Sequence, residues 1–174
     1  MALVVFLRGV NVGRHKRFLP AQLAKELSAF DVVNIGAAGT FVVRKAVSPS
    51  VLRAAIAARL AFDADIIVVK GGELIQFVEN GPFGRRPPAS DEQRFATVLL
   101  RRLSKTPSLP LLIPSGDDWQ VKVVAVSGPF VASVWRRQQA SRPIYPNAAI
   151  EKQIGVATTR NWNTIRAICK ILQP

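Results

Sequence analysis

Short apolar runs separated by polar, glycine-containing breaks divide the first half of the chain into strands and helices. Runs rich in branched residues predict strands over residues 4–8, 32–35, 40–45 and 65–70. Apolar residues at helical spacing predict one helix over Pro20–Ala29 and a second behind the Ser48-Pro49 pair, with Ser48 as its N-cap. The resulting order, β-α-β-β-α-β, is that of a ferredoxin-like unit.

The second half repeats this order less regularly. A short helix over residues 73–79 ends the first half. In the second half, strands are expected over residues 95–103, 120–126, 130–136 and 156–159, a helix over 147–154, and a final helix behind Asn161. Residues 104–114 hold three prolines, so only a short turn or helix is expected there. We therefore predict an α+β fold of two tandem ferredoxin-like (βαββαβ) halves, with antiparallel sheets, helices on one face and a C-terminal helix. The expected domains are residues 1–80, a linker over 81–93, and a degraded second half over 94–174.

Length and composition limit the protein class. The 174 residues fit one domain or two small ones, and 49% apolar residues suffice for a core. The first apolar run is too short to span a membrane, and a single cysteine excludes an intrachain disulfide framework. We expect a cytoplasmic protein without a membrane segment.

The net charge of +13 favours an anionic partner. Residues 1–80 carry 10 Lys/Arg and 6 Asp/Glu, whereas residues 81–174 carry 14 and 5, which makes the second half the expected electrostatic footprint. Nucleic acid is one candidate partner. If the two sheets cover each other, its binding would fall to the basic edges and would be weak, salt-dependent and unspecific. The candidate contacts in the two halves are Arg14, Lys16, Arg17, Arg101, Arg102, Arg136 and Arg137, with Lys105, Lys122 and Arg142 as further cations of the second half.

The loop after the first strand is the first candidate site. Gly9, Asn11 and Gly13 are residue types that tolerate positive φ, and the backbone N–H groups of such a loop can hold an anion. The spacing does not match a Walker loop. A solvated basic turn explains the loop equally, so both interpretations stay open.

A second polar segment, residues 157–164, precedes the final helix. Asn161 is placed to cap that helix, and Arg160 lies beside the helix N-terminus, where anions bind. Trp162 can stack on a base or pack into the core.

These two segments also carry a resemblance. Leu7-Arg8-Gly9-Val10-Asn11-Val12-Gly13 and Ala157-Thr158-Thr159-Arg160-Asn161-Trp162-Asn163-Thr164 resemble the hallmark segments of a bacterial family known as domain of unknown function 1697. The chain departs from the family pattern at Arg14, where a glycine is usual, and at Ala37-Ala38-Gly39-Thr40, where Gln-Ser-Gly-Asn is usual. The family has no assigned function, so the resemblance implies architecture and a site location. The predicted ligand-binding residues are Arg8, Gly9, Asn11, Gly13, Gly39, Thr40, Arg160, Asn161 and Trp162.

Candidate catalytic residues are few. His15 lies among cations without a nearby carboxylate, and Cys169 lies on an apolar helix face, where we expect a buried thiol. One histidine and one cysteine cannot form a zinc site, so neither a metal nor a cofactor is expected. Phe6 and Phe41 are expected in the core.

Three functions stay open. The leading hypothesis is non-catalytic binding of an anionic ligand, either nucleic acid or a phosphorylated small molecule. A small enzyme acting without metal on a phosphorylated or carboxylated substrate is the second, with Arg8, Asn11 and Asn161 polarising an oxyanion. A partner-binding scaffold with an incidentally basic surface is the third. The sequence does not determine the oligomeric state.

Overall fold

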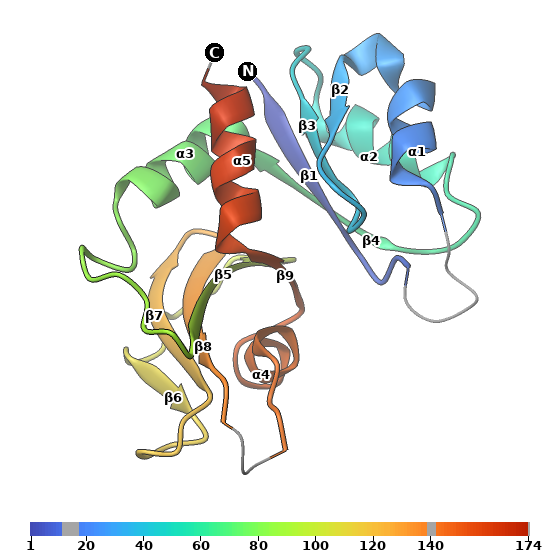
Figure 1. Ribbon diagram of the computed structural model, residues 1–174. Coiled ribbons are helices and arrows are strands. Elements are labelled where there is room, and N and C mark those ends of the chain that lie inside the picture. Colours follow the sequence, from blue (N-terminus) through green and yellow to red (C-terminus); the bar gives the residue numbers. More distant parts are fainter. Residues whose placement is uncertain (12–17, 139–141, 174) are drawn as a thin grey trace. The chain divides into compact units, whose positions relative to one another are not determined.

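The protein is an α+β chain with two antiparallel sheets, seen in a computed structural model that describes residues 1–11, 18–138 and 142–173 (Figure 1). The chain forms two compact units. The first contains Met1–Gln76 and Arg166–Pro174, and the second contains Phe77–Ile165. The predicted domain boundaries at residues 80 and 94 stay a prediction.

The first unit contains a four-stranded sheet in the order β2-β3-β1-β4, with each neighbouring pair antiparallel. Ser48 caps α2 as predicted, because its Oγ accepts a hydrogen bond from the Val51 backbone N–H at 3.3 Å. The elements, in chain order, are β1 (Leu3–Arg8), α1 (Pro20–Glu26), the 3-10 turn η1 (Ser28–Phe30), β2 (Val32–Asn34), β3 (Thr40–Val43), α2 (Pro49–Ala57), β4 (Asp65–Lys70) and the start of α3 (Gly71–Glu79).

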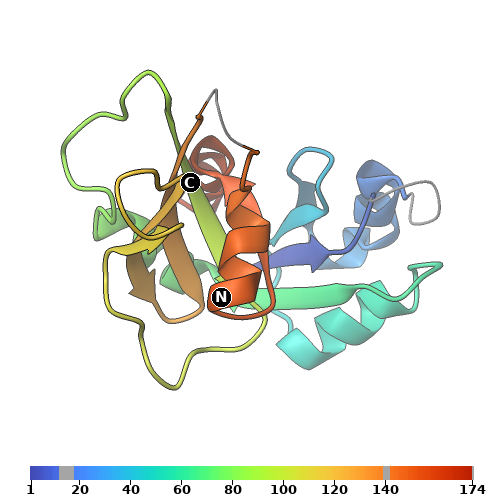
Figure 2. The same cartoon turned by 90° about the horizontal axis from the view of Figure 1, so that it is seen from below.

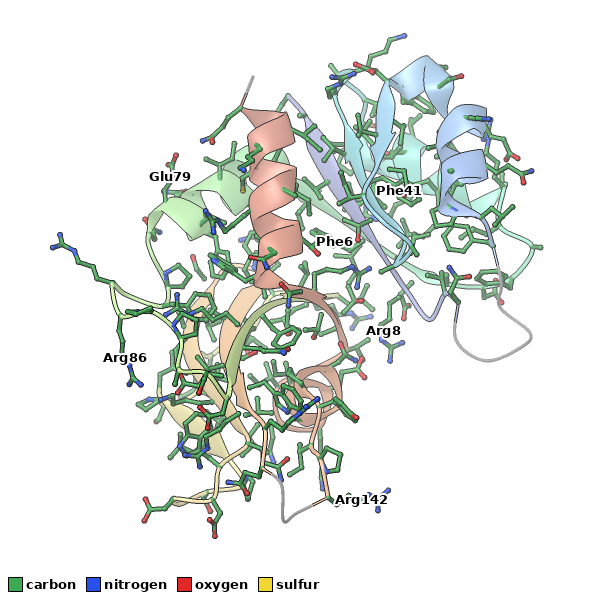
Figure 3. All side chains as sticks on the ribbon, viewed as in Figure 1. Phe6, Arg8, Phe41, Glu79, Arg86 and Arg142 are labelled. Carbon is green, nitrogen blue, oxygen red and sulfur yellow. The ribbon has the colours of Figure 1, made fainter. Side chains whose placement is uncertain are left out.

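Helices α1 and α2 cover one face of this sheet (Figure 1). Val5 and Leu7 of β1 pack on this face against Leu23 of α1 and Leu52 of α2, since alternate strand residues point the same way. Phe41 belongs to the same cluster, and Phe6 is also fully buried, so both phenylalanines are core residues as predicted (Figure 3).

The second unit contains a five-stranded sheet in the order β6-β7-β8-β5-β9. Helices α3 and α5 contribute residues to both units. The remaining elements are β5 (Glu92–Leu99), β6 (Leu111–Ile113), β7 (Val121–Ser127), β8 (Phe130–Arg136), α4 (Pro146–Gln153), β9 (Ala157–Asn161) and α5 (Trp162–Leu172).

Helix α4 covers one face of the second sheet (Figure 1 and, from below, Figure 2). Its Ala149 and Ile150 are buried against Val121 of β7 and Val131 and Trp135 of β8. Successive residues of a strand point to opposite faces of the sheet. Lys122 follows Val121 and Arg136 follows Trp135, so both cations lie on the face away from α4.

The prediction for residues 104–114 was wrong in one part. Leu111–Ile113 form the edge strand β6, paired with β7, instead of a turn or helix. Pro110 and Pro114 flank this strand and leave its ladder intact, because a proline disrupts pairing only within a strand. Among the described residues, the connection from β5 to β7 therefore contains a strand where a ferredoxin-like unit has its first helix.

Candidate functional site

Arg8 forms an ion pair within its own sheet. The β1–β4 register places Asp65 opposite Arg8, and Nη1 of Arg8 donates to Oδ2 of Asp65 at 2.9 Å. The two side chains are 34% and 38% exposed. Solvent therefore screens the pair, and its contribution to stability is at most about 1 kcal/mol. The charge that was expected to bind an anion is partly neutralised by a carboxylate.

Asn11 clamps the loop that follows β1. Its backbone is left-handed, with φ 53°, as is that of Gly9, with φ 76°. The Asn11 amide donates from Nδ2 to the Ala37 carbonyl at 3.0 Å, and its Oδ1 accepts from the Phe18 backbone N–H at 3.0 Å. One side chain thus joins the two ends of the loop and ties them to the turn before β3. Gly13, Arg14, His15, Lys16 and Arg17 lie outside the described residues.

Gly39 sits where the backbone approaches the core closely. Its φ is 69°, and a Cβ there would lie 2.9 Å from Cβ of Leu7 and 3.1 Å from Cγ2 of Val10. Its carbonyl accepts the Leu7 backbone N–H at 2.8 Å. Thr40 follows as the fully buried first residue of β3, opposite Phe6. Tight packing alone therefore accounts for the glycine.

The departure from the family pattern at residues 37 and 38 falls on an exposed turn. Ala37 and Ala38 are both exposed, whereas Gly39 and Thr40 are buried. Methyl groups at these two positions thus change the polarity of the turn surface, not the packing beneath it.

Arg160 is a buried cation of β9. It is only 8% exposed, and its Nη1 donates to Oγ1 of Thr158 at 2.7 Å and to the Thr159 carbonyl at 2.9 Å. Burial lowers the pKa of Arg160 to about 10, because removal from water penalises the charged form. The preceding side chain in the motif, Thr159, faces α4 and donates to Oδ1 of Asn147 at 3.0 Å.

Asn161 and Trp162 form the start of α5. Asn161 Oδ1 accepts the Asn163 backbone N–H at 2.9 Å, which confirms the predicted cap. The Trp162 indole contacts Phe77 and Phe83 edge-on, at centroid distances of 6.1 and 4.8 Å. These contacts favour packing over base stacking as the role of Trp162.

The structure therefore gathers the predicted residues into two groups. Arg8, Gly9, Asn11, Gly39 and Thr40 surround the end of β1 in the first unit. Arg160, Asn161 and Trp162 are consecutive in the second unit. That the two groups form one ligand site stays a prediction.

Basic residues are shared evenly between the two compact units. Residues 77–165 carry 12 Lys/Arg and 6 Asp/Glu, a net charge of +6, and the remaining residues carry 12 and 5, a net charge of +7. The excess found for the second half of the sequence disappears because Arg166 and Lys170 belong to the first unit and Glu79 to the second. Net charge alone thus does not select a binding surface.

Sequence reasoning missed a cluster around Trp119. The guanidinium carbon of Arg136 lies 4.1 Å and the Lys122 Nζ 4.5 Å from the centroid of the Trp119 ring. Arg136 also donates from Nε to the Trp119 carbonyl at 3.1 Å and from Nη2 to the Asp117 carbonyl. In the described part of the chain, neither cation pairs with a carboxylate. The only signal in the sequence was a tryptophan three residues before a lysine.

Two other predicted cations of the second unit lie beside residues other than Trp119. The Arg137 guanidinium is 5.9 Å from the Trp135 ring centroid, and Arg102 lies against Gly128 of the β7–β8 turn. Arg101 is exposed. Arg142, which was predicted, and Arg86, which was not, extend from separate places on the unit (Figure 3).

A pocket of about 310 Å³ lies beside the segment after β5. Sequence reasoning missed this pocket too, because its walls come from segments almost fifty residues apart. It is lined by Leu103, Lys105, Thr106, Pro107, Ser108, Gln153 and Ile154.

Cys169 is buried in α5, as predicted. Within residues 1–11, 18–138 and 142–173, no group of three or more histidine, cysteine and carboxylate side chains could hold a metal ion. In the same ranges no helix combines the length and apolarity needed to cross a bilayer.

Comparison with known proteins identifies the chain only at the level of its family. No curated protein matches it. A similar solved structure is that of the conserved bacterial protein SP0830 from Streptococcus pneumoniae, with 15% identity, a TM-score of 0.63, and coverage of 99% of this chain and 98% of that one. At this identity the likeness shows a shared fold. Residues 1–125 match the family described as protein of unknown function DUF1697, and the chain therefore belongs to that family.

Proposed function

We propose that this protein binds nucleic acid without catalysing a reaction on it, through phosphate contacts made by the second unit. The observation that carries the proposal is the cluster of Trp119, Lys122 and Arg136. Two cations held beside one indole, with no carboxylate partner in the described residues, form a site that is ready for a phosphate.

The indole helps to hold two like charges around one ring. A cation over an aromatic ring is stabilised by about 0.5–1 kcal/mol at exposed sites, which offsets repulsion between neighbouring cations. The two hydrogen bonds from Arg136 to backbone carbonyls fix its orientation further. Phosphate contacts by Lys122 and Arg136 then release counterions, so affinity should fall as salt rises.

The test is fluorescence anisotropy of the full chain with labelled single-stranded RNA, single-stranded DNA and duplex DNA across a salt series. Lys122→Gln should weaken binding to all three and reduce the slope of log K against log salt by about 0.7–0.9, the value of one phosphate contact. Asp118→Asn should tighten binding, because it removes an exposed negative charge next to Trp119.

Lys25→Gln is the matched control, since it removes the same charge from an exposed position on α1 in the first unit. Binding that survives Lys122→Gln unchanged, or that falls equally with Lys25→Gln, would contradict the proposal. The charge would then act only as a general basic surface.

The predicted site at the two motifs remains an alternative location for an anionic ligand. Arg8→Ala belongs in the same titration, since a loss of binding larger than that of Lys122→Gln would move the site to the first unit. The enzyme and scaffold hypotheses stay predictions.

We also infer that both units are ferredoxin-like. The order β2-β3-β1-β4 places the first strand between the third and fourth, and β7-β8-β5-β9 does the same once the edge strand β6 is set aside. The two sheets thus share one strand order, which supports two tandem ferredoxin-like halves. In the second half a strand takes the place of the first helix.

A further inference from the structure

We propose that the pocket between residues 103–108 and the end of α4 binds a small phosphorylated compound that also carries hydroxyl groups, such as a sugar phosphate. This pocket is separate from the Trp119 cluster, and the inference does not depend on the proposed binding of nucleic acid. No part of either family-like motif lines it.

One wall supplies donors for a phosphate. The Lys105 ammonium and the Thr106 and Ser108 hydroxyls line the pocket, and in the described structure none of them forms a hydrogen bond or ion pair with the protein. An ammonium and two hydroxyls can donate to three different phosphate oxygens, and bonds that involve charged partners are the stronger ones.

The charge around this wall is positive. Residues 100–116 contain Arg101, Arg102 and Lys105 and no aspartate or glutamate. The local field therefore favours an anionic group over a neutral one.

The facing wall suits hydroxyl groups. It is formed by Gln153, the last residue of α4, and Ile154, the C-cap. A helix C-terminus carries a partial negative charge, which opposes a bare anion but favours hydrogen-bond donors. The Gln153 amide can both donate and accept. A ligand with its phosphate at Lys105 and its hydroxyls at Gln153 would form hydrogen bonds with both walls of the pocket.

The remaining lining and the size of the pocket agree with a small molecule. Leu103, Pro107 and Ile154 provide apolar surface for the carbon face of a sugar ring. A volume of about 310 Å³ is at the lower end of the range for ligand pockets, which begins at about 300 Å³. A polymer would need a longer groove.

The test is an NMR titration of the full chain, isotopically labelled, with ribose 5-phosphate, inorganic phosphate and ribose at matched ionic strength. We expect ribose 5-phosphate to shift the Thr106 and Ser108 backbone amides and the Gln153 side-chain amide along one saturable curve. Inorganic phosphate should bind more weakly and shift only the Thr106 and Ser108 amide signals. Ribose should shift none of these signals at the same concentrations.

Variants distinguish binding at this pocket from a general effect of positive charge. Lys105→Gln should lower the affinity for ribose 5-phosphate at least tenfold. Thr106→Val, which keeps the side-chain shape, should lower this affinity severalfold. Lys152→Gln removes the same charge outside the lining and should change affinity less than twofold. The proposal is overturned if the shifts do not saturate, if inorganic phosphate and ribose 5-phosphate bind equally, or if Lys105→Gln behaves like Lys152→Gln. The amide spectrum of each variant shows whether it is folded.

Discussion

Replacing Gly39 by alanine should destabilise the protein far more than the same change at Gly36. Both glycines lie in the turn before β3 with nearly equal φ values, 69° and 68°. A Cβ at Gly39 would lie 2.9 Å from Cβ of Leu7, whereas a Cβ at Gly36 would meet nothing within 4 Å. The pair therefore separates steric overlap from backbone strain.

The magnitudes follow from these two terms. A left-handed backbone costs a residue with a Cβ about 1–2 kcal/mol, and both variants carry this cost. Forcing extra volume into a packed core costs about 1–3 kcal/mol more, and only Gly39→Ala carries this cost. The free energy of unfolding should therefore fall by about 2–5 kcal/mol for Gly39→Ala and by about 1–2 kcal/mol for Gly36→Ala.

Urea unfolding followed by circular dichroism measures the difference, and amide exchange locates it. A gap of about 2 kcal/mol moves the midpoint by about 1 M for an m-value of about 2 kcal/mol/M. The Leu7 amide, bonded to the Gly39 carbonyl, should lose protection in Gly39→Ala and keep it in Gly36→Ala. Equal midpoints for the two variants would show that overlap with Leu7 does not explain the glycine.

Three further predictions concern the motif side chains. Asn11→Gly should be less destabilising than Asn11→Ala by about 1 kcal/mol in urea unfolding, because both lose two hydrogen bonds but only alanine is strained at φ 53°. Asp65→Asn should lower stability by at most about 1 kcal/mol, and the loss should shrink in high salt, since the Arg8 pair is partly exposed. For Arg160, burial lowers the folded pKa to about 10, below its usual value in the unfolded chain, so above about pH 10 the unfolded state binds more protons and stability should rise with pH. Urea midpoints measured from about pH 9 to pH 11 should therefore rise more steeply for the native protein than for Arg160→Met, and parallel curves would contradict a buried charge.

The sequence predicted the order of elements because each element has a local signal. Ser48 and Asn161 cap helices, and branched runs such as Asp65–Lys70 form strands. The edge strand β6 was missed because Pro110 and Pro114, on either side of this three-residue apolar run, are typical of a turn. The strand is stabilised by its pairing with β7, which lies outside the run. Pairing between distant residues has no local signal.

The same limit applies to the candidate site. Nothing in the sequence near Arg8 shows that the β1–β4 register supplies Asp65, 57 residues away, as its partner. Arg136 lies 17 residues after Trp119 in the sequence, and the pairing of β7 with β8 brings the two residues together. Residue type thus identified the cations, and only the fold shows which of them are already engaged within the protein.

These partners set a physical condition on any ligand at the two motifs. A ligand at Arg160 would have to replace the hydrogen bonds to Thr158 and Thr159 and reach a guanidinium that is 8% exposed. A ligand at Asn11 would have to replace the two bonds that close the loop, each contributing about 0.5–1.5 kcal/mol. Lys122 and Lys105 face no such competition from a carboxylate in the described structure. A side chain without such partners gains the whole free energy of a phosphate contact, whereas an engaged one gains only the difference from the bonds it gives up. For this reason we propose, as a hypothesis for the titrations above, that anions bind on the second unit outside the motifs.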